Sequence, residues 1–386
     1  MGHFFVSCPL GFEAELTHEI KDFWFEMIDL DGLPTRAEFP EMEAEPGGLA
    51  FETADHLGFQ INLFSKTANR VLLRIAKFEA RYFDQYEKGL SQVDLGKWLD
   101  MDLLKGKLQV KIEHHKSRLN NEKNLLEASQ NVLTKNIIKI SAEAAQTLYV
   151  RIEKDRVMLS LDTSGEHLHR RGYAQHRGEA PLRETLAAYL VRKLAKHTDM
   201  KAPLTIVDPF AGSGTILFEA LSQHRPLFDR TYSWLQFKST PKLFKSPTWT
   251  KNFRWLQNRA NLSAYGFDID AKSVVNFNEN KLKFEKMFQL ENLTLSSLEQ
   301  DSSKLDLSAL PVNGPKWIVT NPPYGIRLND NAALETLTKL EKQVDGLIVI
   351  HPESWNFKFQ NLKQVEQENF NNQGLKLLLT VFKKSI

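Results

Sequence analysis

The sequence predicts an α/β protein whose C-terminal half is a doubly wound, mainly parallel sheet. Residues 204–208 are an apolar strand that ends in an acid, and a turn of small residues and then a helix follow it. A strand, a glycine turn and a helix in this order open such a sheet, whose ligands bind at the carboxyl ends of the strands. Apolar runs then alternate with helical patterns, which favours parallel strands with both faces covered.

Length, charge and cysteine content bound the function. The 386 residues suit two or three domains, and 42% apolar residues suffice for their cores. Because the net charge is only +2, contact with nucleic acid would have to be local. A single cysteine, Cys8, excludes an internal disulfide and a cysteine-based metal cluster and is typical of a reducing cytoplasm. We recognise no targeting signal and no membrane span.

Each predicted domain has its own pattern of elements. Residues 1–60 predict a small α+β lead-in, 61–165 a second α+β unit, 166–180 a basic linker and 181–386 the doubly wound domain. In the first two units we expect strands at 4–6, 49–51, 68–78, 107–113 and 157–162, and helices at 13–28 and 125–140. In the last domain we expect helices at 181–196, 216–221, 273–280 and 334–340, strands at 204–208, 264–270, 317–320 and 345–352, and an antiparallel edge strand at 375–382.

The turn at 208–215 predicts the cofactor. Its glycines are spaced Gly-x-Gly, without the third glycine of a dinucleotide site or the Lys-Ser/Thr of a phosphate loop, so an amino-acid-like ligand is favoured over a pyrophosphate. S-adenosylmethionine fits, because its methionine end needs close approach to the backbone and its ammonium and sulfonium charges suit the carboxylate of Asp208. Thr215 would cap the following helix.

Acids at the ends of the next strands complete this predicted site. Asp268 would hold the ribose hydroxyls, Ile269 would pack against adenine, and Asp301, after a third strand, would accept a hydrogen bond from the adenine amine. Each acid alone is more often a solvated loop residue, but their order along the chain is specific. The predicted cofactor-binding residues are Asp208, Phe210, Gly212, Gly214, Thr215, Asp268, Ile269, Asp301 and Asn321.

A rigid turn, Asn321-Pro322-Pro323-Tyr324, follows the strand at 317–320 and predicts the reaction. Its two prolines fix the backbone and supply carbonyl acceptors without N–H groups. The Asn321 side-chain oxygen and the Pro322 carbonyl would accept the two N–H bonds of an exocyclic base amine. Tyr324 would stack on the base, a contact worth about 1–3 kcal/mol. The alternative is a tight turn with a packing tyrosine.

Motifs along nearly the whole chain resemble one enzyme family. They lie at residues 9–13, 62–63, 67–72, 161–173, 181–188, 208–215 and 321–325. The chain resembles the THUMP-domain class I methyltransferases, and among them the bacterial enzymes that methylate the exocyclic amine of a guanine in large-subunit ribosomal RNA. The resemblance implies a Rossmann-like methyltransferase domain behind ferredoxin-like and THUMP domains. It also implies S-adenosylmethionine as methyl donor, with Asn321, Pro322 and Tyr324 at the target base. Ala211 and Ile326 depart from the residues common in that family.

Local clusters of basic residues are candidate RNA contacts. The candidates are Lys111, Lys116, Arg118, Arg170, Arg171, Lys238, Lys242 and Lys245. The last three lie in the segment 225–259, where cations alternate with aromatic residues as in a groove for single-stranded RNA. A solvated face is the alternative for the charges, and packing is expected for Trp234, Trp249 and Trp255. His167 and His169 lack a third ligand, so we predict no metal.

Together these patterns predict S-adenosylmethionine-dependent methylation of a guanine exocyclic amine in structured RNA. We favour 23S ribosomal RNA over transfer RNA, with the target base flipped or unpaired. The alternatives are an N6-adenine methyltransferase of DNA or RNA, a transfer-RNA guanine-N2 methyltransferase, a protein glutamine methyltransferase and a non-catalytic RNA-binding assembly factor. We predict a cytoplasmic protein without a membrane partner, and the sequence leaves the modified nucleotide and the oligomeric state open.

Overall fold

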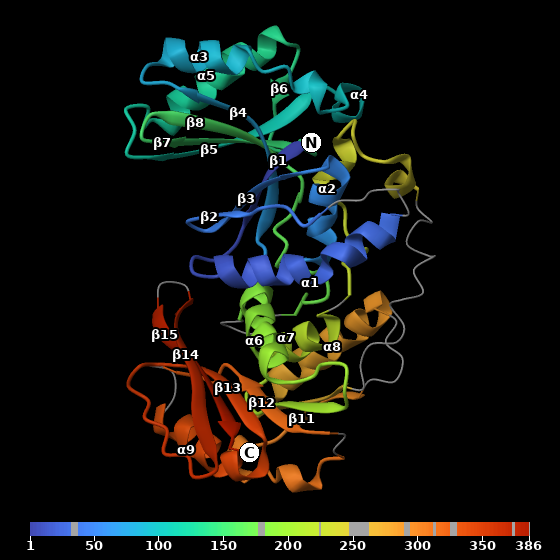
Figure 1. Ribbon diagram of the computed structural model, residues 1–386, viewed down its shortest axis with the longest axis vertical. Coiled ribbons are helices and arrows are strands. Elements are labelled where there is room, and N and C mark those ends of the chain that lie inside the picture. The colour runs from blue at the N-terminus through green and yellow to red at the C-terminus, as the bar shows by residue number, and fades with distance from the viewer. Residues whose placement is uncertain are drawn as a thin grey trace. The chain divides into compact units, whose positions relative to one another are not determined.

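The chain forms two compact units (Figure 1). The computed structural model describes residues 1–31, 38–176, 182–223, 225–246, 262–288, 294–311, 314–324, 330–372 and 375–385. Unit 1 comprises Met1–His169 and Pro226–Phe253, and unit 2 comprises Arg170–Arg225 and Arg254–Ile386. Each unit is built on one sheet.

An eight-stranded sheet in the order β2-β3-β1-β4-β8-β7-β5-β6 forms the centre of unit 1. Its strands are β1 (Gly2–Ser7), β2 (Glu43–Glu45), β3 (Gly48–Thr53), β4 (Arg70–Glu79), β5 (Lys107–His115), β6 (Lys139–Ile140), β7 (Thr147–Glu153) and β8 (Arg156–Asp162). β4 pairs antiparallel with both β1 and β8, so strands from the first 60 residues and from the next hundred share one sheet. All five strands predicted for this half of the chain are confirmed.

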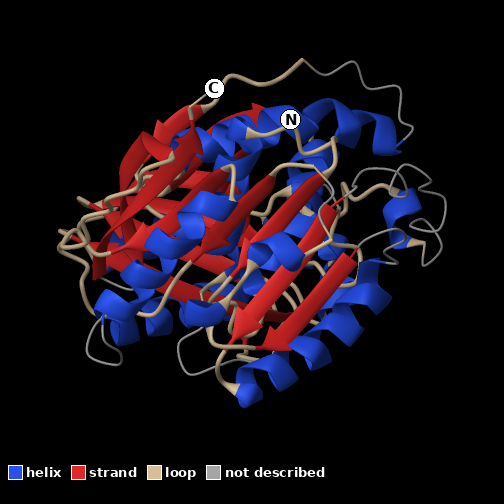
Figure 2. Ribbon diagram, turned by 90° about the horizontal axis from the view of Figure 1, so that it is seen from below, coloured by secondary structure: helices blue, strands red, loops and turns tan. Residues whose placement is uncertain are grey.

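Helices accompany the strands of unit 1. Figure 2 draws all helices of the chain in blue and all strands in red. The helices of unit 1 are α1 (Glu13–Asp31), α2 (Asp55–Phe64), α3 (Phe83–Ser91), α4 (Met101–Leu104) and α5 (Glu122–Lys135), with a 3₁₀ turn, η1, at Leu95–Lys97. The helix predicted at 125–140 is wrong at its C-terminal end. Ile137 has a φ of +61°, a left-handed conformation that cannot continue a helix, and β6 follows it.

A buried polar cluster explains several of the motifs in unit 1. Arg70 forms a buried ion pair with Asp162. The Asn62 amide donates to Thr163 Oγ1 at 2.9 Å and its oxygen accepts from Ser164 Oγ at 2.5 Å. Buried polar groups are stable only when they are hydrogen-bonded, so these residues hold β4, α2 and the end of β8 together. Their residue types are therefore required by the fold of unit 1.

The segment after Pro226 packs into unit 1 through its aromatic residues. Trp234, in the 3₁₀ turn η2 (Ser233–Gln236), is 1% exposed and stacks on Phe59 of α2 with ring centroids 5.9 Å apart. Phe237 also contacts Phe59, and the Leu227 N–H donates to the Leu63 carbonyl at 2.8 Å. The predicted packing role of Trp234 is thus confirmed, whereas Trp249 and Trp255 lie outside the described residues.

A seven-stranded sheet in the order β11-β10-β9-β12-β13-β15-β14 forms the centre of unit 2. Its strands are β9 (Leu204–Asp208), β10 (Leu262–Asp268), β11 (Thr294–Glu299), β12 (Lys316–Thr320), β13 (Gly346–His351), β14 (Leu362–Asn372) and β15 (Leu375–Lys384). The pairings from β11 to β13 are parallel, whereas β15 is antiparallel to both of its neighbours. The antiparallel strand predicted at 375–382 exists but lies inside the sheet, because β14, which we did not predict, forms the edge.

Helices cover both faces of this sheet. They are α6 (Glu184–His197), α7 (Thr215–Ser222), α8 (Ala271–Phe288) and α9 (Asp330–Leu340). Unit 2 also contains the 3₁₀ turns η6 (Ser302–Lys304), η7 (Leu307–Ala309) and η8 (Glu341–Gln343), whereas η3 (Lys242–Lys245) belongs to unit 1. In Figure 1, α6, α7 and α8 lie on one side of the strands and α9 on the other. Leu337 of α9 packs in one core cluster with Val207 of β9, Ile318 of β12 and Val349 of β13.

Three further features bear on function. In the described part of the chain, no helix is long and apolar enough to cross a membrane. Among the same residues, no group of three or more His, Cys, Asp or Glu side chains could hold a metal ion. Cys8 is a buried free thiol whose pKa burial raises to about 12, so it has little of the thiolate character that a reactive cysteine needs.

The packing of Trp234 generates a prediction. The variant Trp234→Ala should destabilise unit 1 by about 3–5 kcal/mol in denaturant unfolding, because it empties a buried site between the segment and α2. Leu243→Ala, at an exposed position of the same segment, should change the free energy of unfolding by less than about 0.5 kcal/mol. Equal unfolding midpoints for the two variants would show that the segment does not contribute to the core.

Candidate active site

The carboxyl ends of neighbouring strands bring the predicted site residues to one edge of the unit 2 sheet. β9 pairs in parallel with β10 on one side and with β12 on the other, with Asp208 opposite Gly266 and Val207 opposite Ile318. Two connecting segments therefore leave the sheet side by side. We call residues 209–214 the glycine turn, and residues 321–324, which the sequence predicted as a turn, the Asn-Pro-Pro-Tyr turn. The chain order reverses between β9 and β12, which is where ligands bind in doubly wound sheets.

The glycine turn needs its glycines. Gly212 and Gly214 have φ values of +53° and +87°, a region that favours glycine. A Cβ atom on Gly214 would also lie only 2.5 Å from the Phe277 ring. Gly214 is the N-cap of α7, so the predicted cap is wrong by one residue, and Thr215 is the first helical residue. The Gly212 N–H donates to Asp268 Oδ2 at 2.9 Å, which ties this turn to β10.

Asp208 is a buried carboxyl at the end of β9. It is 2% exposed, and its Oδ1 accepts from Thr320 Oγ1 at 2.6 Å and from the Phe210 N–H at 3.1 Å. Burial raises the pKa of Asp208 to about 7, although both hydrogen bonds favour the charged form and act against this shift. A group poised in this way changes its charge near neutral pH.

The residues after β10 and β11 have the exposure that a ligand pocket requires. Ile269 is 72% exposed, which leaves an apolar side chain beside Asp268 for a flat ring to cover. Both Asp268 oxygens accept backbone N–H groups, Oδ2 from Gly212 and Oδ1 from Asp270, and each retains a lone pair. Asp301 caps η6 by accepting from the Ser303 hydroxyl and N–H, and these bonds hold the pKa of Asp301 below its usual range. The Gln300 N–H donates to the Asp268 carbonyl at 2.9 Å and so joins the two strand ends.

Asn321 carries the most informative atom of the site. Its Oδ1 is buried and has no hydrogen-bond partner in the described part of the chain. Leaving a buried acceptor unpaired costs about 1–3 kcal/mol, and few such groups occur in a native protein. Pro322 is buried, and Pro323 and Tyr324 are half-buried. Asn321 therefore offers an acceptor to a donor from outside this part of the chain, whereas Gly325 and Ile326 lie outside the described residues.

Thr320 is a site residue that the sequence analysis missed. Its hydroxyl is buried and donates to Asp208, so it links the strand before the Asn-Pro-Pro-Tyr turn to the strand before the glycine turn. Thr320 is the last residue of the buried strand β12. A polar residue at the buried end of this strand was the signal that could have identified it.

The predicted RNA contacts divide between the surface and the core. Exposed positions in unit 1 are occupied by Lys111, Lys116, Arg118, Lys238, Lys242 and Lys245, and Arg170 of unit 2 is also exposed. Arg118 donates to the Tyr82 hydroxyl at 2.9 Å, and Lys111 lies over the Tyr149 ring at 5.7 Å. The prediction for Arg171 is wrong. Its guanidinium is fully buried and pairs with Glu219 of α7 at 3.2 Å, so a polyanion cannot reach it.

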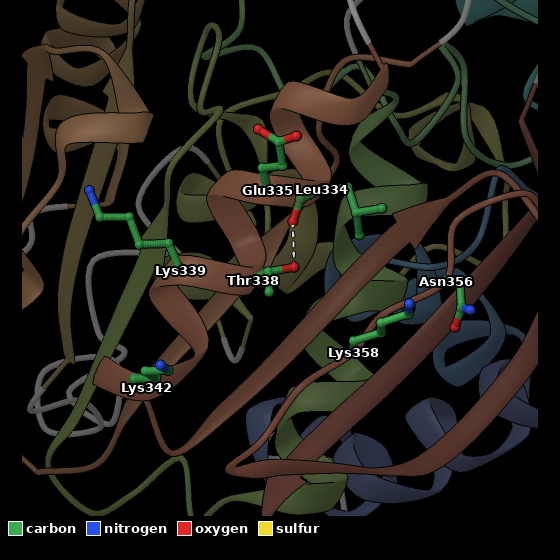
Figure 3. Close-up of a pocket in the computed structure, with 7 residues that line it drawn as sticks. All are labelled: Leu334, Glu335, Thr338, Lys339, Lys342, Asn356 and Lys358. Carbon is green, nitrogen blue, oxygen red and sulfur yellow. Dashed lines mark hydrogen bonds between the residues drawn. The ribbon is translucent and has the colours of Figure 1, made fainter.

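A separate surface groove lies along α9 (Figure 3). It has a volume of about 440 Å³ and is lined by Leu334, Glu335, Thr338, Lys339, Lys342, Asn356 and Lys358. Lys342 follows α9, where the chain returns toward the start of β13, so this end of the groove is remote from the strand carboxyl ends. Lys342 therefore takes no part in the candidate active site, whereas Lys339 donates to the carbonyl of Ser303, the residue that Asp301 caps, at 2.6 Å.

Comparison with known proteins follows the same line. A family model described as "RMKL-like, methyltransferase domain" matches residues 171–364. The chain belongs to this family. Membership confirms the recognition made from the sequence motifs, and it confirms the predicted cofactor, because the family depends on S-adenosylmethionine. The THUMP assignment of the N-terminal half stays a prediction.

Two relatives match most of this methyltransferase chain. It is 28% identical over 371 residues to the "Ribosomal RNA large subunit methyltransferase K/L" of Marinomonas sp. (strain MWYL1), a match covering 91% of this chain and 47% of the relative. It is 27% identical over 357 residues to the "Putative RNA methyltransferase YpsC" of Bacillus subtilis (strain 168), with 86% and 82% covered. The chain thus spans about half the length of the K/L relatives.

Solved structures confirm the Rossmann-like class I methyltransferase fold. A "predicted N6-adenine-specific DNA methylase" from Listeria monocytogenes superposes with a TM-score of 0.73 at 21% identity, covering 98% of this chain and 95% of that one. The structure of "SMU.472, a putative methyltransferase complexed with SAH" gives 0.74 at 20% identity, with 100% and 98% covered. TrmN from Thermus thermophilus gives 0.70 at 16% identity over the whole of both chains.

The residues present fit the family's methyl donor. The left-handed glycines keep side chains away from the backbone of the turn, a buried carboxyl stands behind it, and an exposed isoleucine follows the next strand. The open backbone suits an amino acid group, the carboxyl suits a positive charge, and the isoleucine suits an adenine ring.

The link between Thr320 and Asp208 generates a prediction. Thr320→Val removes the hydroxyl that donates to Asp208 and keeps the shape of the side chain. Because that bond favours the charged form, the variant should raise the pKa of Asp208 above about 7. Carbon-13 NMR of the carboxyl group against pH measures this, and Thr320→Ser should restore the wild-type pKa. An unchanged titration in the valine variant would show that the hydrogen bond is absent in solution.

Proposed function

We propose that this protein uses S-adenosylmethionine to methylate the exocyclic amine N2 of a guanine in large-subunit ribosomal RNA. The observation that carries the proposal is the buried Oδ1 of Asn321, which accepts no hydrogen bond from the described residues. Asn321 directly follows Thr320, the residue that contacts Asp208. A donor from outside the described residues would satisfy that oxygen, and a base amine held there would face the glycine turn. The proposed site is therefore shared by the methyl donor and the base.

Each of the three acids would bind a different part of the methyl donor. Asp208, when charged, would attract the ammonium group and the sulfonium from behind the glycine turn. Asp268 would accept the ribose hydroxyls through its remaining lone pairs, and its two backbone bonds fix its orientation for that task. Ile269 would cover one face of adenine and Asp301 would accept from the adenine amine. Phe210, Gly212, Gly214 and Thr215 would line the turn.

The chemistry then requires alignment more than acid–base assistance. S-adenosylmethionine supplies a methyl group already activated by the positive sulfur. The exocyclic amine of guanine is a weak nucleophile because its lone pair is delocalised into the ring. Asn321 Oδ1 and the Pro322 carbonyl would accept its two N–H bonds and hold the nitrogen toward the methyl carbon, while Tyr324 stacks on the base. Positioning of this kind can lower a barrier by about 7–11 kcal/mol.

The RNA assignment rests on relatives and on local charge. The K/L methyltransferases are named for ribosomal RNA and YpsC for RNA, which supports RNA over DNA for this chain. The exposed cations at Lys111, Lys116, Lys238, Lys242 and Lys245 would contact phosphates. A paired base cannot reach the pocket, so the guanine must be flipped or unpaired. A cytoplasmic location follows from this proposal, because ribosomal RNA is modified where ribosomes are assembled.

The role of Asn321 generates a prediction. Asn321→Ala should lower kcat about 100-fold or more, as removal of one charge-stabilising contact does elsewhere, and should leave RNA affinity within about twofold. The matched control is Asn278→Ala, which removes a surface amide that accepts from Ser297 at 3.2 Å and should be silent. Methyl transfer to ribosomal RNA from a strain lacking the protein provides the assay. Near-normal turnover in Asn321→Ala would remove this residue from its proposed role.

The product of that assay separates the alternatives. Mass spectrometry of the digested RNA should show N2-methylguanosine. N6-methyladenosine, or transfer to DNA in preference to RNA, would establish an adenine methyltransferase instead, and N2-methylguanosine in transfer RNA alone would change the substrate class. Absence of S-adenosylmethionine binding in calorimetry would contradict methyl transfer and favour a non-catalytic RNA-binding protein.

Asp208 generates a prediction on pH. Because burial raises its pKa to about 7, its negative charge is lost as pH falls through 7 and is regained as pH rises. Affinity for S-adenosylmethionine should therefore increase about tenfold between pH 6 and pH 8 in the wild-type protein. Asp208→Asn keeps an acceptor for Thr320 but cannot titrate. The ratio of wild-type affinity to variant affinity at each pH should therefore cancel the titration of the ligand's own amine and report Asp208 alone. A constant ratio across this range would exclude Asp208 as the charged group.

A further inference from the structure

A short segment at the start of unit 2 is fastened to the glycine turn by one buried side chain. We call residues 171–176 the strap. It is held at its first end by Glu219 of α7, which accepts from buried Arg171 and from the Tyr173 hydroxyl. It is held at its other end by Asn280 of α8. The strap is thus bound to α7, which begins at the end of the glycine turn, and to α8.

Asn280 uses both ends of its amide in these contacts. The side chain is 1% exposed. Its oxygen accepts from the Gln175 and His176 N–H groups, each at 3.1 Å, and its nitrogen donates to the His176 carbonyl at 2.8 Å. The same nitrogen donates to the Ser213 carbonyl at 3.4 Å. A single amide therefore connects the backbone of the strap with the backbone of the glycine turn.

A second contact from α8 supports the same part of the turn. Phe277, one helical turn before Asn280, is fully buried, and its ring lies 2.5 Å from the position that a Cβ atom on Gly214 would take. Ser213 and Gly214 are thus held from α8 by one polar and one apolar side chain. Because Gly212 and Gly214 have few steric limits of their own, the conformation of the turn depends on such external contacts.

We propose that Asn280 is a positioning residue for the methyl-donor site. It does not touch the donor. It fixes the Ser213 carbonyl and docks the strap, so the glycine turn keeps the backbone geometry that admits the methionine end of the donor. This inference rests on the proposed function, and it makes the strap, which directly follows unit 1 in the sequence, a structural part of the cofactor site.

The variant Asn280→Asp tests the proposal. It keeps an acceptor for the two strap N–H groups but loses both donations from the nitrogen, including the one to Ser213. The dissociation constant for S-adenosylmethionine, measured by calorimetry, should rise about three- to tenfold, as expected for a lost hydrogen bond. The KM for S-adenosylmethionine should rise in parallel, and kcat at saturating donor should stay within about twofold. The added negative charge alone would favour the cationic donor and lower this dissociation constant, so a rise reports the lost hydrogen bonds.

The matched control is Glu279→Gln. Glu279 is the neighbouring residue of α8 and pairs with His176 Nδ1 of the same strap at 3.0 Å, but its contact is exposed and does not reach the glycine turn. Its affinity for the donor should equal that of the wild type. Thermal unfolding of each variant identifies losses that come from misfolding, and Asn280→Ser, which is neutral and smaller, replaces the aspartate variant if that variant does not fold.

The outcomes separate this inference from the proposed function. Wild-type protein that binds no S-adenosylmethionine overturns both. Wild-type protein that binds the donor, together with folded Asn280 variants that bind it equally well or that lose kcat with an unchanged KM, overturns the positioning role alone. A selective rise in KM, absent from Glu279→Gln, supports it.

Discussion

The hydrogen bond from Thr320 to Asp208 is the interaction on which the site depends. It joins the last residues of β12 and β9 at 2.6 Å, and both side chains are buried. Each of these strands leads directly into one of the two turns, so the bond fixes how far apart the turns begin. Sliding one strand against the other would break this bond and leave the buried Thr320 hydroxyl without its acceptor, which costs about 1–3 kcal/mol.

The same edge of the sheet holds two groups whose surroundings are energetically unfavourable in the described part of the chain. The charged form of Asp208 is disfavoured by burial, and Asn321 has a buried oxygen without a partner in the described part of the chain. Such groups persist where a site is prepared for a ligand, because the ligand supplies what they lack. A cationic donor would stabilise the first and a base amine the second. The methyl donor and the base would therefore bind at neighbouring positions along this edge, and the methyl group would pass from the first to the second.

The sequence predicted the parts of the structure that have local signals. Alternating apolar runs located β9, β12 and β13, and the glycine turn and the Asn-Pro-Pro-Tyr turn were recognisable from residue type alone. What it missed depends on partners distant in the chain. Arg171 is basic, but it forms a buried ion pair with Glu219. Thr320 and Asn280 acquire their roles only when β9 and the strap pack beside them. β14 alternates polar residues and lacks an apolar run, so its edge position was not readable. The aromatic segment after Pro226 gave a packing signal without showing which unit it packs against.

Both turns serve one pocket in the proposed function, and a crystal structure with S-adenosylhomocysteine and a guanosine-containing oligonucleotide is the decisive measurement. The guanine amine should lie within hydrogen-bonding distance of Asn321 Oδ1, with space for a methyl group between it and the cofactor sulfur, so that the reacting atoms would lie about 3–3.5 Å apart. A cofactor bound away from the glycine turn, or a guanine bound away from Asn321, would contradict it.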